Sequence, residues 1–327
     1  MQNNRILVLA SALAIAGVAT IATVHARQTP TPKTTPAAQK PATMPTGQTF
    51  ATPEEAMAAA IKAAGAGADA LLALLGPDAK DLVTSSDAVA DQKERADFVK
   101  AATEKTKLAK DPADPNRITV LIGADEFPTA IPLVRRNGRW FWDVAEGRNE
   151  VLLRRVGGNE LDAITVCRGF VEAQWLYAAL DPDKTGVRQY AQKIMSSPGK
   201  HDGLYWAPEA GGPESPIGDA VARAIAQGYS ADKSPQPYHG YYFKVLTAQG
   251  PSAPLGEMDF MVRGHMIGGF ALIAWPAQYR SSGVKTFMVG SAGLVYEQDL
   301  GPDTVKLASA ITKFDPGKGW TITNDAK

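Results

Sequence analysis

Residues 241–300 restrict the fold more strongly than any other part of this 327-residue sequence. They contain short runs of apolar and β-branched residues, each of strand length, separated by residues that favour tight turns. The runs are residues 241–247, 270–275, 284–289 and 294–296, and the turn residues are Pro276, Ser282-Gly283 and Ser291-Ala292-Gly293. The pattern predicts a compact antiparallel sheet that carries no catalytic motif.

Residues 1–26 have the composition of an export signal. Arg5 is the only charged side chain before an apolar run at residues 6–21, and Val24-His25-Ala26 places small residues at the two positions that signal peptidase reads. We expect cleavage after Ala26 and a periplasmic protein with no stable membrane span, because polar residues interrupt the apolar run. The alternative is an inner-membrane anchor formed by residues 6–24.

The composition changes abruptly at residues 27–47, which contain five prolines, six threonines and no aromatic residue. The charged side chains of this segment, Arg27, Lys33 and Lys40, are all basic. A segment of this kind has too little apolar surface to form a core. The sequence therefore predicts a disordered, extended tether.

Charge and cysteine content narrow the classes of function. Without residues 1–26, 301 residues remain, enough for two domains, with 33 Lys and Arg against 34 Asp and Glu and so a net charge of −1. No basic surplus is present, and a nucleic-acid partner is not expected. Cys167 is the only cysteine, which excludes an internal disulfide. Its spacing from Ile164 and Val171 predicts a thiol on the buried side of a helix.

Residues 48–150 show helical signals first and strand signals afterwards, which is the order of an α+β domain. Thr52-Pro53-Glu54-Glu55 forms a capping box that predicts a helix start, and Asp69 is the expected cap of a second helix ending at Leu75. A third helix is expected over residues 87–105. The expected strands are residues 117–122, 130–136 and 139–144, the last two joined by the hairpin signal Asn137-Gly138.

Residues 151–327 predict a second α+β unit. It is expected to contain a helix over residues 159–180, a Gly/Pro-rich stretch over residues 197–238, and then the antiparallel sheet.

Two resemblances connect these units to known folds. ATPEEAMAAAIKAAGAGADALLALLGPDAKDL, followed by RITVLIG and AIPLVRRNGRWFWDV, resembles the helices and curved sheet of a nuclear-transport-factor-2-like (NTF2-like) cone. NELDAITVCRGFVEAQWLYA, followed by GGFALIAWPAQYRSSGVKTFMVGSAGLVYEQDL, is similar to the long helix and closing strands of type IV pilin and pseudopilin globular domains, whose sheet has about four strands. The resemblances imply an NTF2-like domain at residues 48–150 and a pilin-like domain at residues 151–327.

A third resemblance covers almost all of residues 48–325. The motifs RRVGGNEL, PYHGYYFKVL, GHMIGGFALIAWPAQYRSSGVKTF and DLGPDT resemble the bacterial family of domain of unknown function 2950 (DUF2950). This resemblance implies an exported protein of Gram-negative bacteria and gives no activity.

Catalytic and metal-binding signals are sparse. His201, His239 and His265 are 38 and 26 residues apart, without the close spacing of most helical zinc sites. The carboxylates that can line a pocket of the cone are Asp81, Asp125, Glu126 and Asp143. No histidine lies in the first unit to pair with them, so we expect solvated carboxylates, no metal and no cofactor.

Aromatic residues are the remaining candidates for a binding site. The candidates are Tyr205, Trp206, Tyr238, Tyr241 and Tyr242 in the second unit, and Trp140 and Trp142 in the first. The five in the second unit lie in or after Gly/Pro-rich loops. The sequence favours rings that cover the open face of the sheet, and the alternative is a binding face for a peptide or glycan. The two tryptophans share one side of a strand and are expected in the cone core or its pocket lining.

These observations favour a non-catalytic binding or assembly module of the cell envelope, whose partner is an envelope protein, a peptide or a glycan. A hydrolase or isomerase acting on a small molecule in the cone pocket is the alternative enzyme. A structural subunit that polymerises through exposed sheet edges is the third hypothesis.

Overall fold

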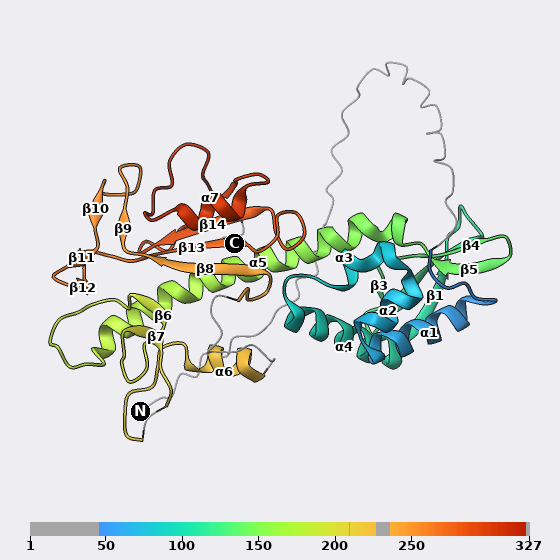
Figure 1. The fold of residues 1–327 in the computed structure, drawn as a ribbon, viewed down its shortest axis with the longest axis horizontal. Coiled ribbons are helices and arrows are strands. Elements are labelled where there is room, and N and C mark those ends of the chain that lie inside the picture. Colours follow the sequence, from blue (N-terminus) through green and yellow to red (C-terminus); the bar gives the residue numbers. More distant parts are fainter. Residues whose placement is uncertain (1–45, 209, 227–235, 325–327) are drawn as a thin grey trace, which may run out of the picture. The chain divides into compact units, whose positions relative to one another are not determined.

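The computed structural model describes residues 46–208, 210–226 and 236–324 (Figure 1). The predicted signal peptide lies outside these residues, as does the predicted tether apart from residues 46 and 47. Predictions about export and about the tether are therefore not tested by the structure.

The described chain opens with helices, as predicted. They are α1 Pro53–Ala66, α2 Ala68–Leu75, the 3-10 helix η1 Pro77–Ala79, α3 Lys80–Val83 and α4 Ala88–Glu104. The Thr52 hydroxyl accepts a hydrogen bond from Glu55 N at 3.1 Å, which confirms the cap of α1. The prediction that Asp69 caps α2 is wrong, because α2 starts at Ala68 directly after Gly67, whose φ of +116° ends α1.

A first antiparallel sheet follows, with the strand order β1-β2-β4-β5 and with β3 paired to β2. The strands are β1 Thr106–Lys110, β2 Arg117–Ile122, β3 Phe127–Pro128, β4 Leu133–Arg136 and β5 Arg139–Trp142. Asn137 and Gly138, with φ of +52° and +76°, form the predicted hairpin turn. Strand β2 has the predicted bounds. The two strands of the hairpin are shorter than predicted, because Pro132 has no N–H to pair in β4 and Asp143 caps the next helix.

Helix α5, Val144–Leu180, is 37 residues long and starts well before the predicted start at Asn159. Asp143 caps it, because its carboxylate accepts a hydrogen bond from Glu146 N at 3.1 Å. In the first half of the helix, Arg155 donates a hydrogen bond to the carbonyl oxygen of Asp81 at 2.9 Å. Farther along, the Glu160 carboxylate accepts from Val284 N at 2.9 Å. The predicted border between residues 150 and 151 falls inside this single helix (Figure 1).

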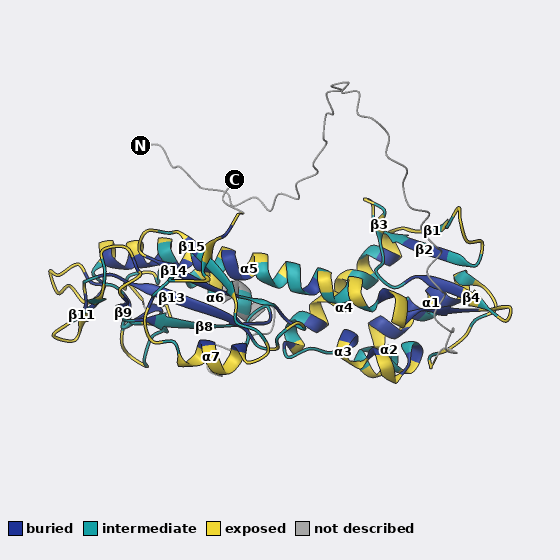
Figure 2. Cartoon of the chain, turned by 90° about the horizontal axis from the view of Figure 1, so that it is seen from above, coloured by how far each residue is buried: buried dark blue, intermediate teal, exposed yellow. Residues whose placement is uncertain are grey.

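The second sheet is antiparallel with the strand order β16-β15-β14-β13-β8. Its strands are β8 Tyr241–Leu246, β13 Ala271–Pro276, β14 Lys285–Gly290, β15 Val295–Asp299 and β16 Thr321–Ile322. The predicted strands are present, and β16 extends the sheet at its edge. Helix α5 and the short helix α7 Thr304–Ala310 both pack on the sheet, whose central strands form the buried core (Figure 2).

Short elements surround this sheet. They are β6 Lys193–Met195 paired with β7 Gly203–Tyr205, β9 Ala248–Gln249 with β10 Met258–Asp259, β11 Met261–Val262 with β12 His265–Met266, and α6 Gly218–Ala226. The architecture is mixed α+β, as predicted. Among the helices of the described residues, none is both long and apolar enough to cross a membrane.

Candidate functional site

The tryptophans of β5 lie in the core of the first sheet. Trp140 and Trp142 are each 7 % exposed and belong to one apolar cluster with Met57, Val120 and Leu133. The indole N–H of Trp142 donates to the carbonyl oxygen of Ala56 at 3.3 Å. Both rings therefore stabilise the packing of α1 on the sheet and are closed to a partner.

Tyr205 and Trp206 do not form a jointly exposed pair. Trp206 is 5 % exposed, and its indole N–H donates to the carbonyl oxygen of Pro213 at 2.9 Å. Its ring packs against His201, with ring centres 4.6 Å apart. Tyr205 is half-buried at the end of β7. The burial of Trp206 argues against its use as an exposed contact.

The three tyrosines near the start of β8 also have structural partners. Tyr241 is fully buried, its hydroxyl donates to the carbonyl oxygen of Lys285 at 2.9 Å, and burial raises its pKa well above the ordinary value. Tyr242 is half-buried against Trp275, and Tyr238 is half-buried and stacked on His239. Tyr238 and Tyr241 pair through their backbones, with Tyr238 N donating to the carbonyl oxygen of Tyr241 at 2.8 Å. Trp140 and Trp142 lie in a different core cluster, and the seven predicted aromatic residues do not form one exposed face.

The histidines lie in three separate contacts. His201 Nδ1 is 3.1 Å from Asp183 Oδ1, His239 Nδ1 is 2.6 Å from Asp162 Oδ2, and His265 Nδ1 is 2.8 Å from Gln189 Oε1. Among the residues that the structure describes, no three His, Cys, Asp or Glu side chains gather as a metal site. The histidine contacts instead connect loops to neighbouring elements.

Three of the four carboxylates singled out in the first unit are engaged in ion pairs. Asp81 pairs with Arg148, and Asp143 pairs with Arg136 at 3.1 Å while it caps α5. Glu126 pairs with Lys107 at 2.6 Å and with Lys105 at 2.9 Å, and hydrogen bonds from these two lysines lower its pKa. The fourth, Asp125, lines a surface groove.

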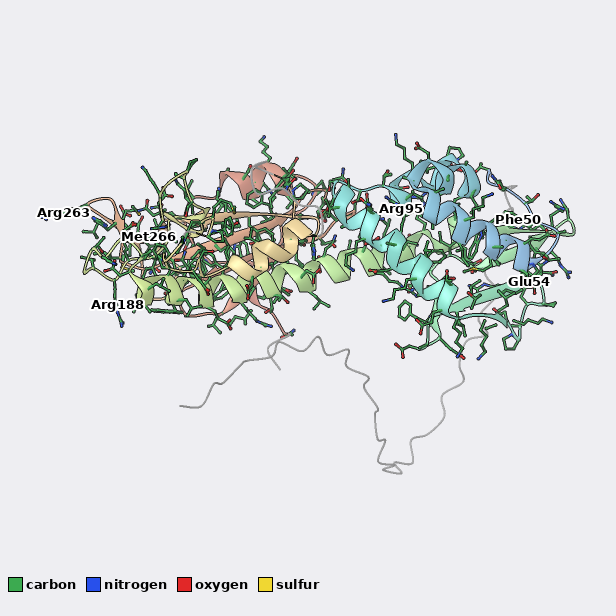
Figure 3. The ribbon with its side chains drawn as sticks, turned by 90° about the horizontal axis from the view of Figure 1, so that it is seen from below. Phe50, Glu54, Arg95, Arg188, Arg263 and Met266 are labelled. Atoms are coloured by element: carbon green, nitrogen blue, oxygen red, sulfur yellow. The ribbon has the colours of Figure 1, made fainter. Side chains whose placement is uncertain are left out.

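This groove, of about 440 Å³, lies between the C-terminal half of α4 and the turn that joins β2 to β3, and we call it the α4–β3 groove. It is lined by Asp97, Phe98, Lys100, Ala101, Glu104, Ile122, Gly123, Ala124, Asp125 and Phe127. Arg95, labelled in Figure 3, lies near the middle of α4, and the first residue that lines the groove, Asp97, follows it by two positions. Its floor is apolar and its rim carries charges.

The turn at the groove is held in an uncommon conformation. Gly123 and Glu126 have φ of +73° and +52°, and Glu126 N donates to the carbonyl oxygen of Gly123 at 3.1 Å. A positive φ is costly for a residue with a Cβ atom. The ion pairs of Glu126 connect this turn to Lys105 at the end of α4 and to Lys107 on β1. The turn consequently presents the next side chain, Phe127, to solvent.

Phe127 is 58 % exposed and yet held in place. The guanidinium of Arg154, on α5, lies over its ring at 4.8 Å from the ring centre. Arg154 is itself fixed, because Nη1 donates to the carbonyl oxygen of Pro128 at 2.7 Å and Nε donates to Glu150 Oε1 at 2.7 Å. Aromatic rings, Phe included, are enriched at the centres of protein interfaces.

The comparison with protein families covers both sheets and this groove. The family described as protein of unknown function (DUF2950) matches residues 47–323. The chain belongs to this family. No curated protein and no solved structure matches this DUF2950 chain.

Sequence reasoning missed the groove of this DUF2950 protein. It interpreted Asp125 as a solvated carboxylate, which agrees with its exposed position, and it assigned no role to Phe127. Phe127 follows Asp125 and Glu126 and precedes Pro128, so it is a poor candidate for a core residue. This local sequence was the signal that could have indicated an exposed aromatic ring.

Proposed function

We propose that this protein is an exported, non-catalytic binding module of the cell envelope and that the α4–β3 groove is its contact surface. The observation that carries the proposal is the exposed ring of Phe127 at the rim of the groove, fixed by Arg154. Export rests on the sequence of residues 1–26, which has the composition of a cleaved signal.

Rigidity is the reason for preferring a binding role for Phe127. Ordering a flexible side chain on association costs affinity, and a ring that is already held avoids most of that cost. The positive φ of Glu126 adds a local cost to folding, and the exposed Phe127 gives back little burial in return. A partner that covers the ring would supply the missing burial.

We also propose that the region around the first sheet is NTF2-like and that the region around the second is pilin-like. The order of α1–α4 before a strongly paired antiparallel sheet supports the first likeness, and the length of α5 beside a five-stranded meander supports the second. In this proposal the groove lies at the outer edge of the cone, beside its apolar core.

Cysteine labelling in cells tests the binding role. Cys167 is fully buried, and burial raises the pKa of its thiol to about 12, so the native chain should react slowly with maleimides. Ala124→Cys places a reactive thiol in the groove, and Ala310→Cys places a matched one at the exposed end of α7. A maleimide that does not cross the inner membrane should reach both.

The expected result is slower labelling of Ala124→Cys in the envelope than in the purified protein, with no such difference for Ala310→Cys. If neither cysteine is labelled more slowly in the envelope than in the purified protein, nothing covers the groove, and the binding role is withdrawn. Labelling only after the inner membrane is broken would contradict export.

A further inference from the structure

We infer that the partner inserts an arginine side chain, flanked by apolar residues, into the α4–β3 groove. This inference rests on the proposed binding function and names the chemistry that the groove recognises. It is drawn from the contacts of Phe127 and from the charges on the rim.

The structure contains an internal example of the contact. Arg154 places its guanidinium over the Phe127 ring while it donates to the Glu150 carboxylate and to the carbonyl oxygen of Pro128. A planar guanidinium suits this combination, because its faces stack on the ring and its N–H groups reach oxygen atoms at the edge. Arg154 is absent from the groove lining, to which Phe127 contributes, so the ring has surface left for a second partner.

The groove side of Phe127 offers the same set of groups. Asp125 and Glu104 line it, and no ion pair joins either carboxylate to another of the described residues. An incoming guanidinium can therefore contact the ring and donate hydrogen bonds to a carboxylate at the same time, as Arg154 does with Glu150.

In the part of the chain that the structure describes, the lysines around the groove do not form ion pairs with Glu104 or Asp125. Lys105 and Lys107 are both directed at Glu126, and Lys93 pairs with Asp97 at 2.6 Å. Lys100 is the remaining cation on the rim, against the two carboxylates of Glu104 and Asp125. The lining itself carries three carboxylates, those of Asp97, Glu104 and Asp125, against Lys100, although the charges balance once Lys93, Lys105, Lys107 and Glu126 around it are included. Glu104 and Asp125 are therefore the groups that a cationic side chain would complement.

The floor of the groove indicates what should flank the arginine. Phe98, Ala101 and Ile122 are half-buried and line the groove next to the core of the first sheet. Their partial exposure leaves apolar surface that a neighbouring aliphatic side chain can cover. The chemistry of the expected ligand is therefore apolar, arginine, apolar.

Synthetic peptides test the inference on the full chain. The probe is N-acetyl-Leu-Arg-Leu amide, and its control replaces arginine by citrulline, which keeps the shape and removes the charge. Binding is measured by NMR titration. We expect the shifts to centre on the groove and the citrulline peptide to bind about tenfold more weakly, as loss of one cation–π and carboxylate contact implies. A peptide with serine in place of leucine should also bind more weakly.

Variants of the groove complete the test. Phe127→Leu and the double change Glu104→Gln with Asp125→Asn should each weaken the arginine peptide, whereas Val187→Ala and Glu172→Gln, exposed elsewhere, should not. Equal binding of the arginine and citrulline peptides, or unchanged binding by the groove variants, would overturn the inference. If the groove is protected in cells but these peptides fail, the binding function stands and only the arginine chemistry is wrong.

Discussion

Glu94, on α4, has a shifted pKa although part of its side chain is exposed. Its pKa is raised above the ordinary value of 4.5, first because the surrounding protein removes water from the carboxylate; Arg155 opposes this, and repulsion from Asp91 and Asp87 adds to it. A carboxyl with a raised pKa in the fold contributes stability below its unfolded pKa and loses it as the pH rises through the folded pKa.

Glu94→Gln should therefore be more stable than the wild type at neutral pH, and this advantage should shrink as the pH falls through the raised pKa of Glu94 and be lost below 4.5. Urea unfolding at several pH values measures the difference. Glu172→Gln, on the exposed side of α5, is the control and should show no such pH dependence. An advantage that grows toward acid pH would contradict the assigned direction.

Trp206 gives a second prediction, because sequence analysis treated it together with Tyr205. Trp206→Ala removes a ring that is 5 % exposed and should cost about 3–5 kcal/mol of unfolding free energy, whereas Tyr205→Ala, in a half-buried position, should cost clearly less. Chemical denaturation of the two variants and the wild type measures both losses of unfolding free energy. Two small and equal losses would mean that Trp206 is not a core residue.

At the scale of elements, α5 explains where sequence reasoning failed. Gly147, Gly157 and Gly158 lie in its first half, and glycine weakens a helix, so the sequence pattern supported a start only at Asn159. Contacts with distant residues, such as Arg155 with the carbonyl oxygens near α3, hold the first half in helical form. The long helix is a result of tertiary packing more than of local propensity.

Substitutions of two glycines in α5 distinguish the effect of local helix propensity from the effect of tertiary packing. Gly157→Ala meets no atom within 4 Å and should raise the unfolding free energy by about 0.5–1 kcal/mol. Gly147→Ala should lower it, because its Cβ would lie 2.6 Å from the Cα of Ile131. Thermal unfolding of the two variants checks both signs. A destabilised Gly157→Ala variant would mean that α5 is not continuous in solution.

The same contrast holds for strands. The Asn137-Gly138 turn and the apolar runs of the second sheet were predicted correctly because their signals are local. Strand β1 was missed, since Lys107 and Lys110 give it a polar sequence and its pairing with β2 is visible only in the fold. Strand β16 was missed because it has two residues and both are exposed.

At the scale of the whole molecule, the sequence predicted the α+β class, the two sheets and the family, and it did not predict the groove. The groove depends on α4 meeting the turn before Phe127, and no local pattern connects these two segments. Burial was equally hard to foresee: Leu161 and Trp175 fit the apolar spacing around Cys167, and yet they are 59 % and 49 % exposed. Spacing identifies a helix face, whereas the fold decides how much of that face is covered.

The central claim is that the α4–β3 groove contacts a partner in the envelope through Phe127, and photocrosslinking in living cells tests it most directly. A photoreactive amino acid replaces Lys100 on the rim of the groove, or Lys306 on exposed α7 as the control. We predict an adduct from position 100 that is lost when Phe127→Ala is added, and none from position 306. No adduct at position 100, or one that persists without the Phe127 ring, would contradict the claim.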